Sequence, residues 1–138
     1  WNVENMHVIP NARTFNSIEK SDVSSRRVIT VGRYTYQKGF ERLIDAWAVL
    51  VENHPDWILT IVGDGEERDA LAKQIEVRGL TSSILLQPST KNINKEYMNS
   101  SIMVMSSRFE GLPMTLLEAQ AYGLPIVSFA CKCAFSIF

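Results

Sequence analysis

The amino-acid sequence predicts an α/β protein with a Rossmann-like open parallel sheet and helices on both of its faces. Two observations support this fold class. Short apolar runs alternate with amphipathic segments whose apolar residues recur at helical spacing. Glycine or polar clusters follow the apolar runs, at the points where strands are expected to end. Right-handed crossovers between such parallel strands distribute the helices over both faces.

The first strand is predicted over residues 28–31, a β-branched run that ends at Gly32. A polar loop follows and leads into a helix predicted over 40–52, because apolar residues are spaced three and four apart there. The second strand is predicted over 57–62, where another apolar run ends at a glycine.

A capping box is predicted to open the second helix. Asp64 and Glu67 have the spacing in which the cap and third-residue side chains bind each other's backbone N–H groups. This helix is expected to run to about Val77, and Gly79 suits the residue that ends it.

The rest of the chain continues the alternation. A strand, a short helix, a strand, a helix and a last strand are predicted over residues 83–86, 94–99, 102–106, 113–122 and 126–129. Pro113 suits the first position of its helix because that position needs no N–H donor, and Gly123 can close the helix before Pro125.

Residues 1–27 have a mixed composition in which only 6–10 resembles a strand, so they are predicted to be a linker segment. Residues 28–138 are predicted to form one Rossmann-like domain. A chain of 138 residues with 46% hydrophobic content can bury the core of such a domain. Trp1 stands where a Met would begin a complete protein, so we expect the chain to be part of a longer one.

Composition excludes several functional classes. A net charge of -1 with scattered basic residues argues against a nucleic-acid partner. No run approaches 18 apolar residues and no signal peptide is recognisable, which predicts a cytoplasmic protein. Cys131 and Cys133 are too close together for an ordinary disulfide and provide half of a tetrahedral metal site, so we interpret them as inert thiols.

Polar clusters follow the predicted strands, and the carboxyl ends of parallel strands meet at one edge of a sheet, where ligands bind. Arg33 and Lys38 lie in the first of these loops, and together they suit a diphosphate. The alternative is a pair of solvated loop cations. The fourth strand, its tight loop and the helix beginning at Pro113 form a second anion site, because free N–H groups point outward there.

A metal site is not expected. Asp64-Gly65-Glu66 is explained by a helix cap and turn. The chain also contains no Asp-x-Asp, the arrangement with which many transferases hold a divalent ion on a diphosphate. Arg33, Lys38 and the helix end would therefore neutralise a bound phosphate without a metal cofactor.

Glu110 and Glu118 allow three interpretations. They are an unrelated loop and helix glutamate, or a glycosidase acid/base pair, or two groups that bind different hydroxyls of one extended ligand. Glu118 lies five residues after Pro113, about 7.5 Å along the helix axis, and would sit to the side of whatever Glu110 contacts. That placement favours the third interpretation over the second.

In its motifs the sequence resembles the retaining glycosyltransferases of GT-B architecture, in the large group sometimes called family 4. The matching segments occur in the family's order and spacing, and they are residues 8–11, 31–33, 38–40, 43–46, 61–65, 106–113, 116–119 and 122–127. Each segment is weak alone, but the whole set is specific. The resemblance implies that residues 28–138 form the nucleotide-sugar-binding, C-terminal domain of such an enzyme, in incomplete form.

The resemblance also implies a role for each matching residue. Arg33 and Lys38, beside Gly32, would hold the diphosphate, and Glu110 would contact the donor sugar as the first glutamate of the E-x7-E motif. These three charged residues are the predicted catalytic groups. Glu118, the second glutamate of the motif, would bind the ribose hydroxyls. The distal phosphate would face the segment from Gly111 to Thr115, which includes Pro113, through the N–H groups of Gly111, Leu112, Met114 and Thr115. The base would lie near Thr90 and Lys91.

The implied reaction transfers a sugar from a nucleotide-diphosphate sugar to an acceptor hydroxyl with retention of anomeric configuration. Relatives of this kind usually act in bacterial surface polysaccharide synthesis, in the cytoplasm or at the periphery of the inner membrane. The acceptor, a glycan or lipid-linked sugar, would bind an N-terminal domain that this sequence lacks. The chain also stops soon after its fifth strand, so we expect no transferase activity from it alone, and self-association through an uncovered apolar face.

Two other classes of function remain open from the sequence. The chain can be a non-catalytic nucleotide- or phosphate-binding module that uses the same sheet edge, or a purely structural fragment. A second Rossmann-like half before Trp1 would favour the transferase. In the structural fragment, replacement of Arg33 or Glu110 by alanine would change no ligand titration.

Overall fold

The computed structural model describes residues 19–131, and within them five strands alternate with four helices. The predicted order of elements is confirmed, and most boundaries move by one or two residues. The elements are β1 (Arg27–Val31), α1 (Phe40–Asn53), β2 (Ile58–Val62), α2 (Arg68–Val77), β3 (Ile84–Gln87), α3 (Ile93–Met98), β4 (Ile102–Met105), α4 (Met114–Ala121) and β5 (Ile126–Ser128).

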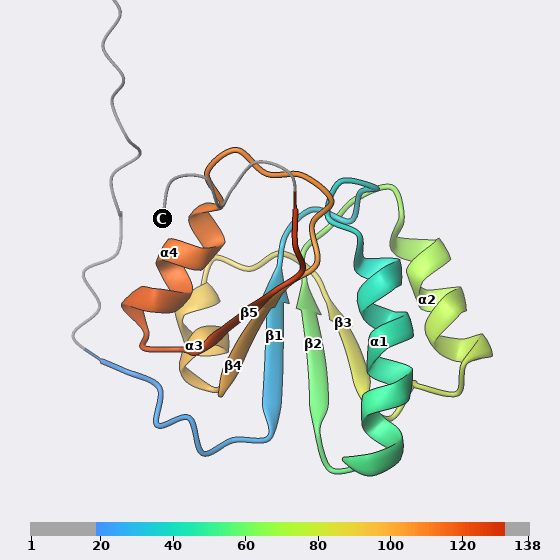
Figure 1. Cartoon of the computed structure of the whole chain (residues 1–138), viewed down its shortest axis with the longest axis horizontal. Helices are drawn as coiled ribbons and strands as arrows, with labels where there is room; N and C mark the ends of the chain where they lie inside the picture. The colour runs from blue at the N-terminus through green and yellow to red at the C-terminus, as the bar shows by residue number, and fades with distance from the viewer. Residues whose placement is uncertain (1–18, 132–138) are drawn as a thin grey trace, which may run out of the picture.

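The strands form one parallel sheet in the order β3-β2-β1-β4-β5. From β1 the chain builds outward to β3, returns to the other side of β1 at β4, and ends at β5. The strand order therefore reverses between β1 and β4, which is the point where open α/β sheets bind ligands. The predicted Rossmann-like fold is confirmed, and the loops after β1 and β4 lie together at the upper edge of the sheet in Figure 1.

Helices cover both faces of the sheet, with α1 and α2 on one side and α3 and α4 on the other (Figure 1). Alternate residues of a strand point to opposite faces, so neighbouring residues of β1 enter different cores. Val28 packs in the core beneath α1 and α2, whereas Ile29 packs in the core that contains Tyr97 and Leu116 from α3 and α4. Both cores are made of buried apolar side chains, so side chains on both faces of β1 are buried.

Glycines allow the ends of β1 and β2 to approach closely. A Cβ atom on Gly63 would lie 1.9 Å from the carbonyl oxygen of Gly32, so any side chain there would force the strands apart. Gly32 N–H donates to the carbonyl of Val62 at 3.0 Å, and Tyr34 N–H donates to that of Asp64 at 2.9 Å. The ladder between the two strands thus continues into their loops and holds the first loop in place.

Two predicted helix starts differ from the structure. The capping box at Asp64 and Glu67 does not form: α2 begins at Arg68 with no side-chain cap. Asp64 instead accepts two hydrogen bonds from Ser89, in the loop after β3. Pro113 has extended backbone, with φ -75° and ψ 98°, so it precedes α4 and is not its first residue.

Part of the predicted linker packs against the domain. Ser21 N–H donates to the carbonyl of Tyr122 at 2.9 Å, and the Ser25 hydroxyl donates to that of Asn99 at 2.9 Å. β1 itself begins at Arg27, one residue before the predicted boundary. The strand-like residues 6–10 lie outside the part of the chain that the structure describes, so the linker assignment remains a prediction.

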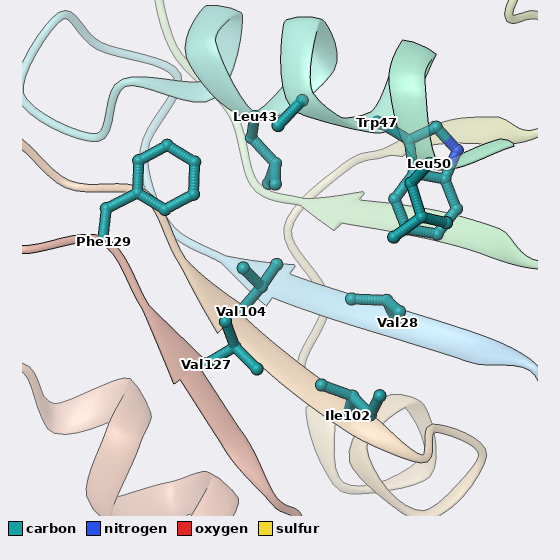
Figure 2. Close-up of a pocket in the computed structure, with 9 residues that line it drawn as sticks. Val28, Leu43, Trp47, Leu50, Ile102, Val104, Val127 and Phe129 are labelled. Carbon is teal, nitrogen blue, oxygen red and sulfur yellow. The ribbon is translucent and has the colours of Figure 1, made fainter. Parts of the chain in front are cut away.

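Within residues 19–131, no helix covers one part of the sheet. On the face that carries α1, an apolar pocket of about 230 Å³ lies between α1 and the strands β1, β4 and β5 (Figure 2). Trp47 and Leu50 border it from α1, and Val127 borders it from β5, where its side chain is 54% exposed. Apolar surface of this kind is available for contact with another part of a protein.

Among residues 19–131, no helix is long and apolar enough to cross a membrane. The same residues contain no group of three or more His, Cys, Asp or Glu side chains arranged to hold a metal ion. Cys131 is a free thiol, and Cys133 lies outside the described residues.

Candidate functional site

The loops after β1 and β4 are joined by hydrogen bonds at the point where the strand order reverses. The Ser106 hydroxyl donates to the carbonyl of Lys38 at 2.8 Å, and Arg108 N–H donates to the carbonyl of Gln37 at 2.8 Å. The guanidinium of Arg42 in α1 donates to the carbonyl of Ser106 at 2.6 Å. These bonds connect segments about 70 residues apart and fix the two loops relative to each other.

Lys38 and Glu110 meet within this pair of loops. The Lys38 Nζ donates to Glu110 Oε1 at 2.6 Å, and the Ser107 hydroxyl donates to the same oxygen, also at 2.6 Å. Glu110 is 8% exposed and Ser107 is 2% exposed. The carboxylate is thus held at one oxygen by a cation and a buried hydroxyl, while Glu110 Oε2 has no hydrogen-bond partner among the described residues.

The absence of a side chain at Gly32 leaves room for the side chain of Lys38. A Cβ atom at this position would lie 3.0 Å from Cε and 3.1 Å from Cδ of Lys38. The lysine stem therefore lies across the end of β1, in space that a larger residue would occupy.

Arg108 supports the first loop, although it was not among the predicted site residues. It forms an ion pair with Glu41 at the start of α1, and it stacks 3.9 Å from the ring centroid of Tyr36. It also donates to the carbonyl of Tyr36 at 2.7 Å. Burial of the Glu41 carboxyl opposes ionisation, but the hydrogen bond and charge of Arg108 outweigh it and lower the pKa of Glu41.

Arg33 lies on the other side of Gly32, where it is exposed and borders a pocket. Its side chain has no partner among the described residues. The pocket has a volume of about 440 Å³ and lies at the ends of the first three strands, lined by Val31, Gly32, Arg33, Val62, Gly63, Asp64, Ser89, Thr90 and Ile93. The predicted base-binding residue Thr90 thus shares a pocket with Arg33, whereas Lys91 is exposed beside it and is not among the lining residues.

Asp64 shapes the far wall of this pocket. Its Oδ2 accepts hydrogen bonds from the Ser89 hydroxyl at 2.5 Å and from Ser89 N–H at 2.9 Å. These two bonds lower the pKa of Asp64, so the carboxylate stays charged and keeps the loop after β3 against the loop after β2.

The segment after Glu110 leads directly to the start of α4. Gly111 and Leu112 are exposed, Pro113 is buried, and Met114 and Thr115 are half-buried in the first turn. α4 has no side-chain cap, and the N–H groups of Met114 and Thr115 make no hydrogen bond within the described chain. Free N–H groups and the positive end of the helix dipole favour an anion at this place.

Glu118 lies in the second turn of α4 and faces α3. Its Oε2 accepts a hydrogen bond from the hydroxyl of Tyr97 at 2.8 Å. Tyr97 is fully buried and stacks on Tyr122, with ring centroids 5.4 Å apart. Glu110 and Glu118 share no hydrogen-bond partner among the residues that the structure describes, so it provides no support for a paired acid and base across one bond.

The structure brings most of the predicted residues to one edge of the sheet. It brings Lys38 and Glu110 into contact and puts Arg33 and Thr90 in the neighbouring pocket. Sequence reasoning missed the hydroxyl donors to the two glutamates. Ser107 lies within a motif that was recognised, so its spacing to Glu110 offered a signal, whereas the contact with Tyr97 joins two helices and had none.

Comparison with known proteins identifies the family. A family model described as Glycosyl transferases group 1 matches residues 12–137. The amylovoran biosynthesis glycosyltransferase AmsD of Erwinia amylovora is 41% identical over 139 residues, which cover 96% of this chain and 39% of AmsD. An uncharacterized glycosyltransferase of Methanocaldococcus jannaschii is 38% identical over 104 residues, or 75% of this chain and 26% of that protein. The chain spans less than half the length of either relative.

Solved structures agree with this family. A mutant of S. aureus TarM, crystallised with Fondaparinux, alpha-GlcNAc-glycerol and UDP, matches with a TM-score of 0.87 and 25% identity, over 100% of this chain and 28% of TarM. The C-terminal domain of the glycosyl transferase group 1 protein LpcC from Francisella tularensis matches with a TM-score of 0.67 and 25% identity, over 75% of this chain and 58% of that one. The chain belongs to the glycosyl transferases group 1 family and has the Rossmann-like fold of its GT-B members.

Proposed function

We propose that this chain is the donor-binding half of a retaining glycosyltransferase, which moves a sugar from a nucleotide-diphosphate sugar to an acceptor hydroxyl. The observation that carries the proposal is the contact between Lys38 and Glu110 where the strand order reverses, close to the uncapped start of α4. A cation, a carboxylate with one free oxygen and free N–H groups suit a sugar joined to a diphosphate.

Each group has a distinct role in the proposed site. Arg33 and Lys38 offset the charge of the diphosphate, and the N–H groups of Met114 and Thr115 face its distal phosphate. Glu110 uses its free oxygen for a hydroxyl of the donor sugar. Glu118 accepts from the ribose hydroxyls, and the base occupies the pocket beside Thr90.

The proposed chemistry breaks the bond between the anomeric carbon of the sugar and the diphosphate oxygen. The acceptor oxygen forms the new bond from the same face, and its proton leaves with the diphosphate. The protein contributes mainly electrostatic stabilisation of the departing diphosphate by Arg33, Lys38 and the helix end. We propose that these groups do this without a metal cofactor, since the chain has no Asp-x-Asp.

We propose a role in bacterial surface polysaccharide synthesis, in the cytoplasm or at the periphery of the inner membrane in the full-length protein. AmsD is named for amylovoran biosynthesis, and a Salmonella typhimurium relative is named a lipopolysaccharide 1,6-galactosyltransferase. The acceptor, a glycan or lipid-linked sugar, would bind a second domain across the edge that carries Lys38 and Glu110. The isolated chain is therefore expected to bind a donor weakly and to transfer no sugar.

We further propose that the isolated chain self-associates through the pocket of Figure 2, with a second copy of the chain as the occupant. The lining residues are all apolar, and the exposed Val127 belongs to the edge strand β5. Burial of such a surface between two copies removes apolar area from water, and an edge strand offers unpaired backbone groups for the contact.

Calorimetric titration tests the donor site. UDP, GDP and ADP and their sugar conjugates are added to the chain, to Arg33→Ala and to the control Lys73→Ala, which removes an exposed cation from α2. We expect one nucleotide to bind, Arg33→Ala to weaken it about tenfold or more through the lost charge-assisted contact, and Lys73→Ala to match the wild type. Equal binding by all three chains would contradict the proposal. If a nucleotide binds and its sugar conjugate binds with no higher affinity, a non-catalytic nucleotide-binding module is favoured.

A further inference from the structure

Glu118 is held by a single residue in the described part of the chain. The hydroxyl of Tyr97 donates to its Oε2 at 2.8 Å, and Oε1 has no hydrogen-bond partner there. The two residues belong to α3 and α4, which cover the same face of the sheet (Figure 1). The bond therefore fixes the direction of the carboxylate relative to a second helix, which rotation about the side-chain bonds of Glu118 would otherwise leave open.

The hydroxyl of Tyr97 keeps its proton and therefore acts as a hydrogen-bond donor. Its side chain is fully buried, and its ring stacks on Tyr122 with an interplanar angle of 18°. Burial and then the neighbouring charge of Glu118 raise the pKa of Tyr97 far above its ordinary value, so the phenol keeps its proton. A buried hydroxyl that always carries its proton must donate, and the carboxylate of Glu118 is the acceptor within reach.

The same face of α3 borders the pocket beside Arg33. Ile93, which lines that pocket, lies one turn before Tyr97, and residues four apart share a helix face. Tyr97, the donor to Glu118, therefore lies on the face of α3 whose residue Ile93 borders the pocket.

We propose that Tyr97 is a positioning residue, which holds Oε2 of Glu118 so that Oε1 accepts a hydrogen bond from the vicinal hydroxyls of a nucleotide ribose. This inference rests on the proposed function, since it needs a nucleotide in the site. It adds a residue that contacts no ligand and acts through Glu118. Without the phenol hydroxyl, the carboxylate of Glu118 loses its fixed direction. Nucleotide binding must then order the carboxylate, and the entropy cost of this ordering lowers the affinity.

A pair of tyrosines provides a matched test. Tyr97→Phe removes the hydroxyl that Glu118 accepts from and keeps the stacked ring. Tyr122→Phe removes a hydroxyl from the other ring of the stack, and that hydroxyl makes no hydrogen bond within the described chain. Each chain is titrated by calorimetry with UDP, GDP and ADP and with the 2′,3′-dideoxy form of whichever nucleotide the wild type binds.

A positioning role predicts a selective loss. Tyr97→Phe weakens the ribonucleotide about tenfold, the scale of one hydrogen bond to a charged group, and leaves the dideoxy nucleotide unchanged. Tyr122→Phe behaves as the wild type with both ligands. In a chain that already carries Glu118→Ala, Tyr97→Phe produces no further loss, because the residue through which it acts is gone.

Other outcomes separate this inference from the proposed function. If Tyr97→Phe weakens both ligands equally, weakens neither, or unfolds the chain, Tyr97 is a core residue and the inference is wrong, while the donor site stands. A further loss in the Glu118→Ala chain also overturns it. If the wild type binds none of the three diphosphates, the proposed function itself fails, and the inference fails with it.

Discussion

Lys38 and Glu110 are 72 residues apart in the chain, yet Nζ and Oε1 lie 2.6 Å apart at the place where the strand order reverses. The contact is supported by the hydrogen bonds between the two loops and by the absence of a side chain at Gly32. It keeps a cation and a carboxylate partly buried beside the start of α4. Substitution of either residue therefore tests whether the pair stabilises the fold as well as whether it binds a ligand.

Breaking this pair on one side should destabilise the fold. Lys38→Met leaves the buried Glu110 carboxylate with Ser107 as its remaining donor, and we expect a loss of about 2 kcal/mol in the free energy of unfolding. The double variant Lys38→Met/Glu110→Gln should recover most of this loss, because no uncompensated charge remains. Urea denaturation measures both.

The surface pair of Arg78 and Asp45 is the control, since both side chains are at least 44% exposed. Arg78→Met should cost no more than about 0.5 kcal/mol. If Lys38→Met costs no more than this control, the contact between Lys38 and Glu110 is not a structural element of the site.

Close packing of the strand ends predicts different tolerances for two glycines. Gly63→Ala would bring a Cβ to 1.9 Å from the backbone of Gly32 and should destabilise the chain by about 3 kcal/mol, because backbone cannot move aside as a side chain can. Gly111→Ala meets no atom within 4 Å and should leave the unfolding free energy within about 0.5 kcal/mol of the wild type. Similar midpoints for the two variants in thermal denaturation would contradict this account of the sheet edge.

A pH-dependent effect is expected at Glu67. Burial raises its pKa above the ordinary value of 4.5, and the charges of Glu41 and Glu66 add to this. Because the fold favours the protonated form, that contribution to stability is present below pH 4.5 and is lost as the pH rises through the higher folded value. Glu67→Gln should therefore raise the Tm at pH 7 and leave it unchanged at about pH 3.5.

Glu76→Gln, at an exposed position of α2, the helix that Glu67 precedes, serves as the control and should show no such difference between the two pH values. A Glu67→Gln chain whose Tm shift is the same at both would mean that the carboxyl of Glu67 is not desolvated in solution.

Self-association should depend on the apolar pocket of Figure 2. Val127→Lys puts a charge on the edge strand at its border and should shift the isolated chain to monomer, as charged residues do on exposed strand edges. Val77→Lys changes a residue that is 77% exposed at the end of α2 and should have no effect. Sedimentation velocity measures both, and a monomeric wild type would rule out this contact.

The sequence was sufficient for the order of elements because each strand and helix has its own local pattern. The apolar spacing in α1 and the glycine after α2 are properties of short segments, and they predicted both ends of α1 and the end of α2 to within one residue. The expectation that Lys38 and Glu110 lie at one edge of the sheet followed from a general rule about where parallel strands end, together with a family resemblance, whereas their ion pair was not predicted.

What failed depended on contacts between distant segments. Asp64 has the spacing of a helix cap, but Ser89 from the next loop offers it two donors, and the local prediction is therefore wrong. The donor to Glu118 could not be predicted, because the meeting of Tyr97 with it depends on how α3 and α4 pack on the sheet. Periodicity indicates that both helices have a buried face, but it does not indicate which residues touch across them.

The central claim is that the ends of β1 and β4 form one site for a nucleotide-diphosphate sugar. Its most direct test is a titration of the isotope-labelled chain with UDP, GDP and ADP, followed by amide chemical shifts. We expect one nucleotide to perturb the amides of Gly32, Arg33, Met114 and Thr115 together, with a common saturation curve. Shifts confined to the pocket of Figure 2, or absent from the loops after β1 and β4, would contradict it.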